Sequence, residues 1–172
     1  MRPRSTPRST VVIDPSDVRI EPLAGHDRSA FDCGVRPLDV YFQRSAGQDS
    51  RRRVANVYVA LVGEVTEVAA FDTLSACGVP RQALPPGTSR RLPRYDTLPA
   101  VLMRRLAVDR RWQGQGLGGI LIVDAVERVR RSGIGAIGLL VDAKDPSAAD
   151  FYDRHGFDAL TDDRRTLFRS CA

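Results

Sequence analysis

The stretch between Arg110 and Gly119 reads RRWQGQGLGG and places four glycines within six consecutive positions. An apolar pattern with helical spacing follows it, so the glycines stand at the start of a predicted helix. Glycine lets the backbone turn so that successive N–H groups point outward, and the helix macrodipole favours negative charge at the same end. Such a loop is an anion site, and it most naturally binds the two phosphates of a pyrophosphate.

Other glycine-rich loops bind different phosphates, and their spacing separates them from this one. Gly114, Gly116 and Gly119 match GxGxxG, and Asp142 lies at a tolerable distance downstream for the ribose contact of a dinucleotide site. However, five polar or bulky residues (109–113) separate the first glycine from the preceding strand, and the chain offers too few βαβ units for a Rossmann domain. A Walker loop is excluded because no Gly-Lys-Ser/Thr follows. A turn that only packs the helix onto a sheet remains an alternative.

Alternating and helical apolar patterns predict the other elements. Strands are predicted over Val18–Leu23, Val54–Val62, Val65–Leu74, Ala100–Val108, Ala136–Val141, Phe157–Leu160 and Thr166–Arg169. Helices are predicted over Pro37–Ser50, from the glycine loop to Gly133, and from Pro146 to about His155. The second and third strands are expected to form an antiparallel hairpin at Gly63 and Glu64. Together these elements predict a mixed α/β sheet with one parallel crossover in its middle.

Almost every positive charge is an arginine, because Lys144 is the only lysine, and the net charge is +5. Arginine pairs with phosphate through two parallel hydrogen bonds, so the composition favours a phosphate-bearing partner, either a nucleic acid or a phosphorylated cofactor. A general preference for arginine on solvated faces is the alternative. The segment from Gly78 to Leu98 carries four prolines and four arginines, which predicts a long basic loop in contact with substrate.

Length and composition predict one soluble domain. The chain has 172 residues, of which 42% are hydrophobic, and no apolar run is long enough to span a membrane. We expect a single domain over residues 16–172, preceded by a flexible basic arm over residues 1–15. The three cysteines and two histidines have no spacing typical of a disulfide framework or a metal site. We therefore expect no metal. We also expect the protein to be located in the cytoplasm.

The glycine loop, taken as Arg111-x-x-Gly114-x-Gly116, resembles the acetyl-CoA pyrophosphate motif of the GCN5-related N-acetyltransferase (GNAT) superfamily. The preceding RRLAVD and the following FYDRHGF agree with this resemblance. It implies a GNAT fold, with a mixed twisted central sheet of about 6–7 strands flanked by about 4 helices. It also implies acetyl-CoA as the donor. The implied cofactor-binding residues are Leu106, Ala107, Val108, Arg111, Gln113, Gly114, Gln115, Gly116, Leu117, Gly118, Gly119 and Asp145.

Tyr152, in FYDRHGF, stands where many GNAT enzymes carry a tyrosine that protonates the departing thiolate of coenzyme A. The chemistry is reasonable, because a thiol with a pKa near ~8.5 leaves and a phenol with a pKa near ~10 donates when it is well placed. The alternative is a core tyrosine beside Phe151. No general base stands out, and His26 and His155 are interpreted as structural or surface residues.

The N-terminal half is similar to the GNAT toxins of bacterial type II toxin–antitoxin systems. FDCG (Phe31–Gly34) and the following Leu38-Asp39 are the most specific parts, and the resemblance covers Val18 to Phe168. Ala70-Phe71 replaces the usual Gly-Tyr of that group. The resemblance implies a homodimeric enzyme that acetylates the α-amine of aminoacyl-tRNA and blocks translation. A ribbon-helix-helix antitoxin would neutralise it.

Two groups of arginines are candidates for tRNA contact, because phosphates need cations near the expected acceptor side. They are Arg51, Arg52, Arg53, Arg90, Arg91 and Arg94. Two other functions remain open. One is a GNAT enzyme for a small amine or a protein N-terminus, and the other is a non-catalytic module that binds acyl-CoA.

Overall fold

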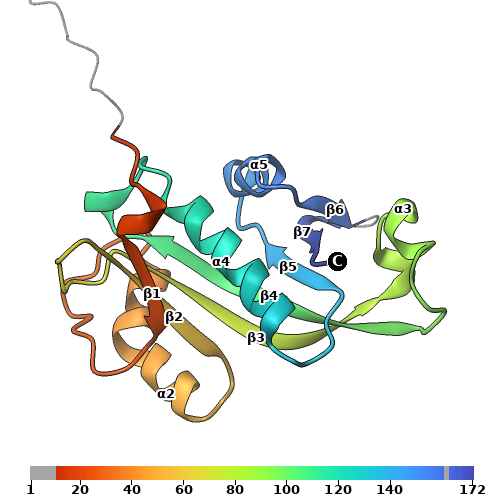
Figure 1. The fold of residues 1–172 in the computed structure, drawn as a ribbon, viewed down its shortest axis with the longest axis horizontal. Coiled ribbons are helices and arrows are strands. Elements are labelled where there is room, and N and C mark those ends of the chain that lie inside the picture. The colour runs from red at the N-terminus through yellow and green to blue at the C-terminus, as the bar shows by residue number, and fades with distance from the viewer. Residues whose placement is uncertain (1–10, 161–162) are drawn as a thin grey trace, which may run out of the picture.

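The computed structural model describes residues 11–160 and 163–172, and in these residues a seven-stranded sheet has the order β1-β2-β3-β4-β5-β7-β6 (Figure 1). The strands are β1 (Val18–Pro22), β2 (Asn56–Val62), β3 (Ala70–Pro80), β4 (Thr97–Val108), β5 (Gly138–Asp142), β6 (Asp158–Leu160) and β7 (Asp163–Ser170). Within this sheet all neighbouring pairs are antiparallel except β4 and β5, which are parallel. The predicted mixed sheet with one parallel crossover is confirmed.

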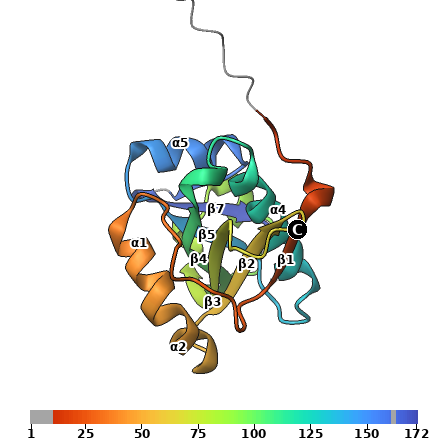
Figure 2. The same ribbon diagram turned by 90° about the vertical axis from the view of Figure 1, so that its left-hand side faces the viewer.

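Helices cover both faces of the sheet. Figure 2 shows α1 (Arg36–Val40) and α2 (Ala46–Arg51) on one side and α4 (Leu117–Arg131) on the other. The helix α5 (Pro146–Arg154) contributes Tyr152 to the core that α4 forms with the sheet. The short α3 (Pro86–Ser89) lies at the far end of β3 and β4 (Figure 1). Within the described chain, none of the helices has both the length and the apolar character that a membrane crossing needs.

The helix predicted after the glycine loop is confirmed as α4. It begins directly after Gly116, whose φ of 89° places it in the left-handed region, and Gly133 follows its end. Its apolar stripe is buried as the spacing predicts. The buried residues are Leu117, Leu121, Ile122, Ala125, Val126 and Val129.

The helix predicted over Pro37–Ser50 is also present, but its pitch changes in the middle. A π-helical turn, η2 (Tyr41–Ser45), separates α1 from α2. Phe42 and Ala46, four residues apart on one helical face, both reach the core and are 0% exposed. The Phe42 ring stacks on the Phe71 ring of β3 with 4.2 Å between centroids, which holds this helical segment against the sheet.

The predicted start of the third strand is wrong, because β3 begins at Ala70 instead of Val65. The ladder with β2 closes at the pair Ala60 and Ala70, and the amide of Ala69 still donates to the carbonyl of Ala60 at 2.8 Å. Residues 63–69 form the connection. Val65 is an apolar residue of this connection and is 37% exposed, so its apolar character does not mark a strand.

The predicted long loop from Gly78 to Leu98 is wrong at both ends. The β3–β4 ladder continues to the pair of Pro80 with Thr97, so only residues 81–96 connect the two strands. They include η3 (Arg81–Ala83) and α3. Proline removes a single ladder N–H, so it is tolerated near strand ends and does not by itself mark a loop.

The predicted N-terminal arm lies mostly outside the described residues, which exclude residues 1–10. Ile13, which the prediction assigns to the arm, is 7% exposed and packs with Leu117 and Leu121. Its amide donates to the carbonyl of Gln115 at 2.9 Å. This part of the chain therefore packs against the glycine loop and α4.

Candidate active site

Two strands that start side by side separate in the middle of the sheet. β4 and β5 pair in parallel over three residues, the last being Met103 with Val141. The register of β4 against β3 then shifts by one residue at Arg104, which forms a β-bulge. Bulges bend a strand and increase its local twist. Because β5 ends at Asp142 while β4 continues to Val108, the sheet opens between the two carboxyl ends.

The glycine loop joins this open end of β4 to α4. Gly114 and Gly116 have φ angles of 72° and 89°, in a region that side-chain-bearing residues rarely adopt. Gly116 caps α4 without any side-chain hydrogen bond, so the first N–H groups of the helix have no side-chain acceptor. These donors stand at the positive end of a 15-residue helix, an arrangement that fits a pyrophosphate.

The helices α4 and α5 approach each other closely beside the glycine loop, and a cavity lies between the loop and α5. A Cβ on Gly119 would lie 2.7 Å from Nε2 of His155, so a larger residue here would require the His155 ring to move. Nδ1 of His155 lies 2.7 Å from the carbonyl oxygen of Phe151, which orients the ring. We call the space of about 510 Å³ between the loop and α5 the loop cavity. It is lined by Leu106, Val108, Trp112, Gln113, Gly114, Gly116, Leu117, Gly118, Gly119, Lys144, Asp145, Ser147, Ala148, Phe151, Tyr152 and His155.

A second cavity of about 600 Å³ lies on the other side of the opening. We call it the arginine cavity because Arg104 and Arg105 line it together with Lys144. Its further lining comes from the FDCG segment, α1, β4, the glycine loop, β5 and α5. These residues are Cys33, Val35, Pro37, Leu38, Leu106, Ala107, Val108, Gln113, Asp142, Ala148 and Tyr152.

Three cations of the arginine cavity are available to a ligand. Among the described residues, none of Arg104, Arg105 and Lys144 forms an ion pair. Arg105 is held in place by stacking, with its guanidinium carbon 3.6 Å from the centre of the Tyr41 ring. Tyr41 in turn donates its hydroxyl proton to Asp49 at 3.0 Å. A preorganised cation of this kind suits a phosphate.

Tyr152 lies in the wall that the two cavities share. Its side chain is 8% exposed, and its ring makes edge contacts with Phe151 and Phe157 at centroid distances of 5.3 and 5.4 Å. Burial, and then the negative charges of Asp72 and Asp142, raise the pKa of Tyr152 to about 12. The phenol therefore keeps its proton at neutral pH. Within the described chain its hydroxyl has no hydrogen-bond partner, so it is free to serve a ligand.

The structure brings most of the predicted cofactor residues together. Ten of the loop and strand residues predicted from the sequence line the loop cavity or the arginine cavity. They are Leu106, Ala107, Val108, Gln113, Gly114, Gly116, Leu117, Gly118, Gly119 and, at the start of α5, Asp145. Asp145 also caps α5, since its Oδ1 accepts a hydrogen bond from the amide of Ala148 at 2.8 Å.

Two predicted cofactor residues line neither cavity. Arg111 donates to Oδ1 of Asp109 through its Nε at 2.9 Å, and Asp109 is 2% exposed. Nε2 of Gln115 donates to the carbonyl of Arg111 at 3.1 Å. These contacts hold the loop in place without lining either cavity. Asp109 further accepts from the amide of Asp32 at 3.1 Å, so the same acid joins the loop to the FDCG segment.

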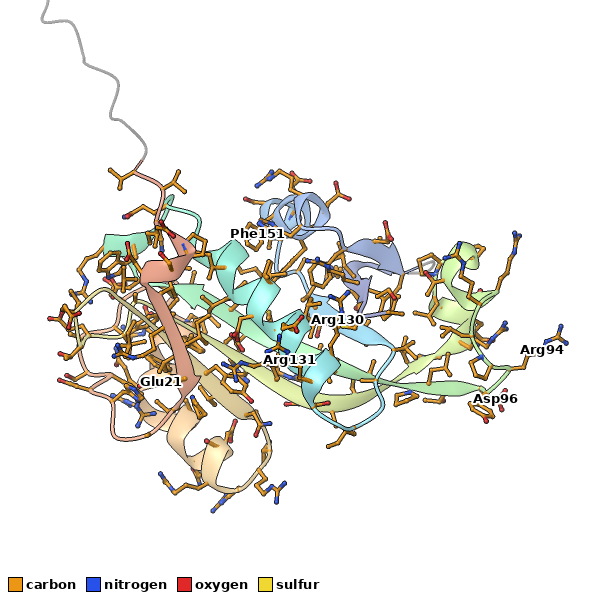
Figure 3. The ribbon with its side chains drawn as sticks, in the orientation of Figure 1. Glu21, Arg94, Asp96, Arg130, Arg131 and Phe151 are labelled. Atoms are coloured by element: carbon orange, nitrogen blue, oxygen red, sulfur yellow. The ribbon has the colours of Figure 1, made fainter. Side chains whose placement is uncertain are left out.

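The predicted tRNA arginines also lie outside both cavities. Arg51, Arg52 and Arg53 stand at the end of α2, and Arg90, Arg91 and Arg94 follow α3. Figure 3 shows Arg94 at the end of the molecule far from Phe151. The 12 residues of β4 separate the two ends of the sheet, about 36 Å at ~3.3 Å per residue.

Sequence reasoning missed Arg104, Arg105 and Lys144 as candidate ligands of a phosphate. The first two belong to RRLAVD, which reads as an ordinary strand, and alternation cannot show that a bulge places both at one cavity. Gln113 has a further role that its position in the loop does not reveal. Its Nε2 donates to the carbonyls of Cys33 and Val108, each at 2.8 Å, so it bridges the walls of the two cavities.

Asp72 of β3 is a buried acid beneath this site. It is 0% exposed, and neither carboxylate oxygen has a hydrogen-bond partner in the described part of the chain. Burial and the like charge of Asp124 raise the pKa of Asp72 well above its usual range, and Arg128 opposes them. An unpaired carboxylate in such surroundings is costly, so the neutral acid is the favoured form.

We expect this acid to make stability depend on pH. The folded protein keeps the Asp72 proton to higher pH than the unfolded chain, so stability falls as pH rises above the unfolded-state pKa. The loss is about 1.4 kcal/mol per pH unit until the folded-state pKa is reached. Asp72→Asn cannot ionise and should lose this slope in urea unfolding at pH 5, 6 and 7. The exposed Asp158→Asn is the matched control, and equal slopes in both variants would contradict the expectation.

Comparison with known proteins places the chain among acetyltransferases. The family model described as Acetyltransferase (GNAT) domain matches residues 55–159. A probable toxin TacT from Sinorhizobium fredii is 30% identical over 152 residues, which cover 82% of this chain and 84% of that protein. A tRNA-acetylating toxin from Mycobacterium tuberculosis is 31% identical over 134 residues, covering 77% and 78%.

Solved structures agree over nearly the whole chain. AtaT complexed with acetyl-methionyl-tRNAfMet has a TM-score of 0.82 at 29% identity, covering 90% of this chain and 95% of that one. AtaTR bound with AcCoA has a TM-score of 0.76 at 29% identity, covering 91% and 95%. A tyrosine-to-phenylalanine mutant of the AtaT toxin bound to the C-terminus of the antitoxin AtaR has a TM-score of 0.74 at 26% identity, covering 90% and 94%. The chain is a member of the GNAT acetyltransferase family.

Proposed function

We propose that this chain is the toxin of a type II toxin–antitoxin system, which transfers the acetyl group of acetyl-CoA to the α-amine of an aminoacyl-tRNA. Such transfer would block translation. The observation that carries the proposal is the position of Tyr152 between the loop cavity and the arginine cavity. The first fits a pyrophosphate, and the second presents unpaired cations suited to RNA phosphates. Donor and acceptor would therefore meet at the phenol.

The donor side is built from backbone groups. When bound, acetyl-CoA supplies an activated acetyl thioester. The N–H groups at the start of α4 would bind its pyrophosphate, and the edge of β4 from Leu106 to Val108, which β5 leaves unpaired, would bind the pantetheine arm. Asp145 lines the same cavity, while Arg111 and Gln115 would act by holding the loop. The AtaTR complex with AcCoA supports acetyl-CoA as the donor.

Tyr152 would act as a general acid. Its raised pKa keeps the phenol protonated, which is the form that a proton donor needs. The proton is held at the phenol oxygen, between the two cavities, where a departing thiolate would accept it. The acceptor α-amine, with a pKa of about 7.7–8.0, releases its proton to water far more readily than a lysine amine with a pKa near ~10.4. A dedicated strong base is therefore not required.

The acceptor side favours an RNA. Arg104, Arg105 and Lys144 would bind phosphates near the charged 3′ end, as the TacT-like and tRNA-acetylating relatives suggest. The arginines at 51–53 and at 90, 91 and 94 stand away from the cavities. We propose that they contact phosphates of the tRNA body rather than its reacting end.

Partners and organisation follow from the same proposal. A ribbon-helix-helix antitoxin would neutralise the enzyme, and the AtaT complex with the AtaR C-terminus supports an antitoxin partner. We further propose a cytoplasmic homodimer in which residues 16–172 form one acetyltransferase domain behind a basic arm over residues 1–15. Two copies would join their basic surfaces into one tRNA-binding face.

The test is to incubate the purified protein with labelled acetyl-CoA and a pool of charged tRNAs. We expect label on the α-amine of the aminoacyl group, released together with the amino acid on mild alkaline hydrolysis. Uncharged tRNA is the matched control and should stay unlabelled. Label confined to added small amines or to protein N-termini would instead support a GNAT enzyme of another substrate class. No transfer to any amine, with acetyl-CoA still bound, would indicate a binding module.

A further inference from the structure

Asp142 is the last residue of β5 and stands where β4 and β5 separate. Among the described residues that line the arginine cavity, it is the only acid, and the cations are Arg104, Arg105 and Lys144. The cavity therefore combines one carboxylate with three cations in its lining. It suits a ligand that carries one positive group close to several negative ones.

The Asp142 side chain is accessible and makes few contacts within the protein. It is exposed, and its Oδ1 accepts a hydrogen bond from Oγ1 of Thr166, its cross-strand neighbour on β7, at 3.2 Å. It forms no ion pair with any described residue. Its charge is one of those that raise the pKa of Tyr152, which agrees with the two side chains lining the same cavity.

From this placement we infer that Asp142 binds the α-ammonium group of the acceptor and holds it beside Tyr152, an inference that rests on the proposed function. An α-amine with a pKa of about 7.7–8.0 is mostly ammonium at pH 7, so it needs a negative partner in a basic cavity. A carboxylate accepts a charge-assisted hydrogen bond from it. The three cations would bind the RNA phosphates on the 5′ side of the aminoacylated nucleotide.

The arrangement also selects among amines. A polyamine carries several positive charges and would meet three cations and one acid, so repulsion would disfavour it. An aminoacyl ester of RNA carries one ammonium on the same terminal nucleotide as a phosphodiester, which matches both signs. In the N-acetylated product this nitrogen is a neutral amide. Asp142 would therefore bind the product more weakly than the substrate.

The chemical step is balanced without a further reactant. The ammonium releases one proton to water, and the neutral nitrogen then forms a bond to the acetyl carbon while the bond from that carbon to sulfur breaks. The amine loses its second proton to water, and the Tyr152 phenol donates a proton to the sulfur and regains one from solvent. Asp142 orients the nitrogen throughout and neither gains nor loses a proton overall.

The first experiment measures kinetics of Asp142→Asn with the pool of charged tRNAs. We expect the KM for charged tRNA to rise about ten-fold at pH 7, the loss typical of removing one charged hydrogen-bond partner. The KM for acetyl-CoA should not change. Above pH 8.5, where the free α-amine is mostly neutral, the difference between Asp142→Asn and the wild type should shrink. Asp153→Asn, which removes an exposed acid on the outer side of α5, is the control.

A second experiment has a readout besides activity. Filter binding without acetyl-CoA compares charged tRNA with the same tRNA after chemical N-acetylation. The wild type should prefer the charged form, and Asp142→Asn should lose that preference. Equal binding of both forms by the wild type, or an unchanged preference in Asp142→Asn, would overturn the inference. Absence of labelled product from the wild type, with this preference present, would overturn the proposed activity and leave the assignment of Asp142 standing.

Discussion

Replacing Tyr152 with phenylalanine is expected to slow acetyl transfer by about 10²- to 10⁴-fold, the range typical for loss of a general acid. The hydroxyl is the only group removed, and the ring contacts with Phe151 and Phe157 remain. Acetyl-CoA binding by calorimetry and the Tm should therefore stay close to those of the wild type. The rate is measured by single-turnover transfer of label to charged tRNA, which separates chemistry from product release.

The same residue predicts the alkaline side of the pH profile. Because the pKa of Tyr152 is raised to about 12, its deprotonation should not reduce the rate between pH 7 and pH 10. Tyr95→Phe is the matched control, since it removes a phenol hydroxyl from a residue that is 66% exposed and lines neither cavity. A single-turnover rate in Tyr152→Phe within a few-fold of the wild type would remove the residue from its role.

Replacing Phe42 with alanine is expected to destabilise the protein by about 3–5 kcal/mol, as for other fully buried phenylalanines. Phe42 is 0% exposed, stacks on Phe71 and makes an edge contact with Phe31 at 4.8 Å. The deletion therefore opens a cavity at the centre of the core under α1 and α2. Urea unfolding gives the free energy of unfolding directly.

Loss of the Phe42 packing should also affect binding of the acceptor. Val35, Pro37 and Leu38 line the arginine cavity and belong to the segment that Phe42 anchors. We therefore expect the KM for charged tRNA to rise while the KM for acetyl-CoA changes little. Phe42→Leu keeps most of the volume and should cost less than about 1.5 kcal/mol. A Phe42→Ala protein as stable as the wild type would show that this core does not hold the helical segment.

Much of the fold could be predicted from the sequence because its signals are local. The apolar spacing after Gly116 marks α4, and the buried run before Asp142 marks β5. Asp145 followed by Pro146 marks the start of α5, and the cap is formed as the residue types indicate. The conformation of the glycine loop is also set by residues close in the sequence, so its position before a helix could be predicted.

The sequence could not predict the strand boundaries around Pro80 or the position of the arginines. The ladder of β3 with β4 runs past Gly78 because the partner strand supplies hydrogen bonds that compensate for poor local propensity. The sequence shows that residues 90, 91 and 94 are basic but not where they lie. The length of the β3–β4 ladder places them at the far end of the sheet. Their contact with tRNA stays a prediction.

The sequence by itself determined the glycine loop at the helix start, the mixed sheet and the tyrosine helix, because backbone conformation, capping and periodicity act over a few residues. Only the tertiary structure decided which side chains share a cavity. The bulge at Arg104 and the early end of β5 at Asp142 are products of pairing between distant strands. That pairing opens the sheet, places Tyr152 between two cavities and sets one carboxylate among three cations.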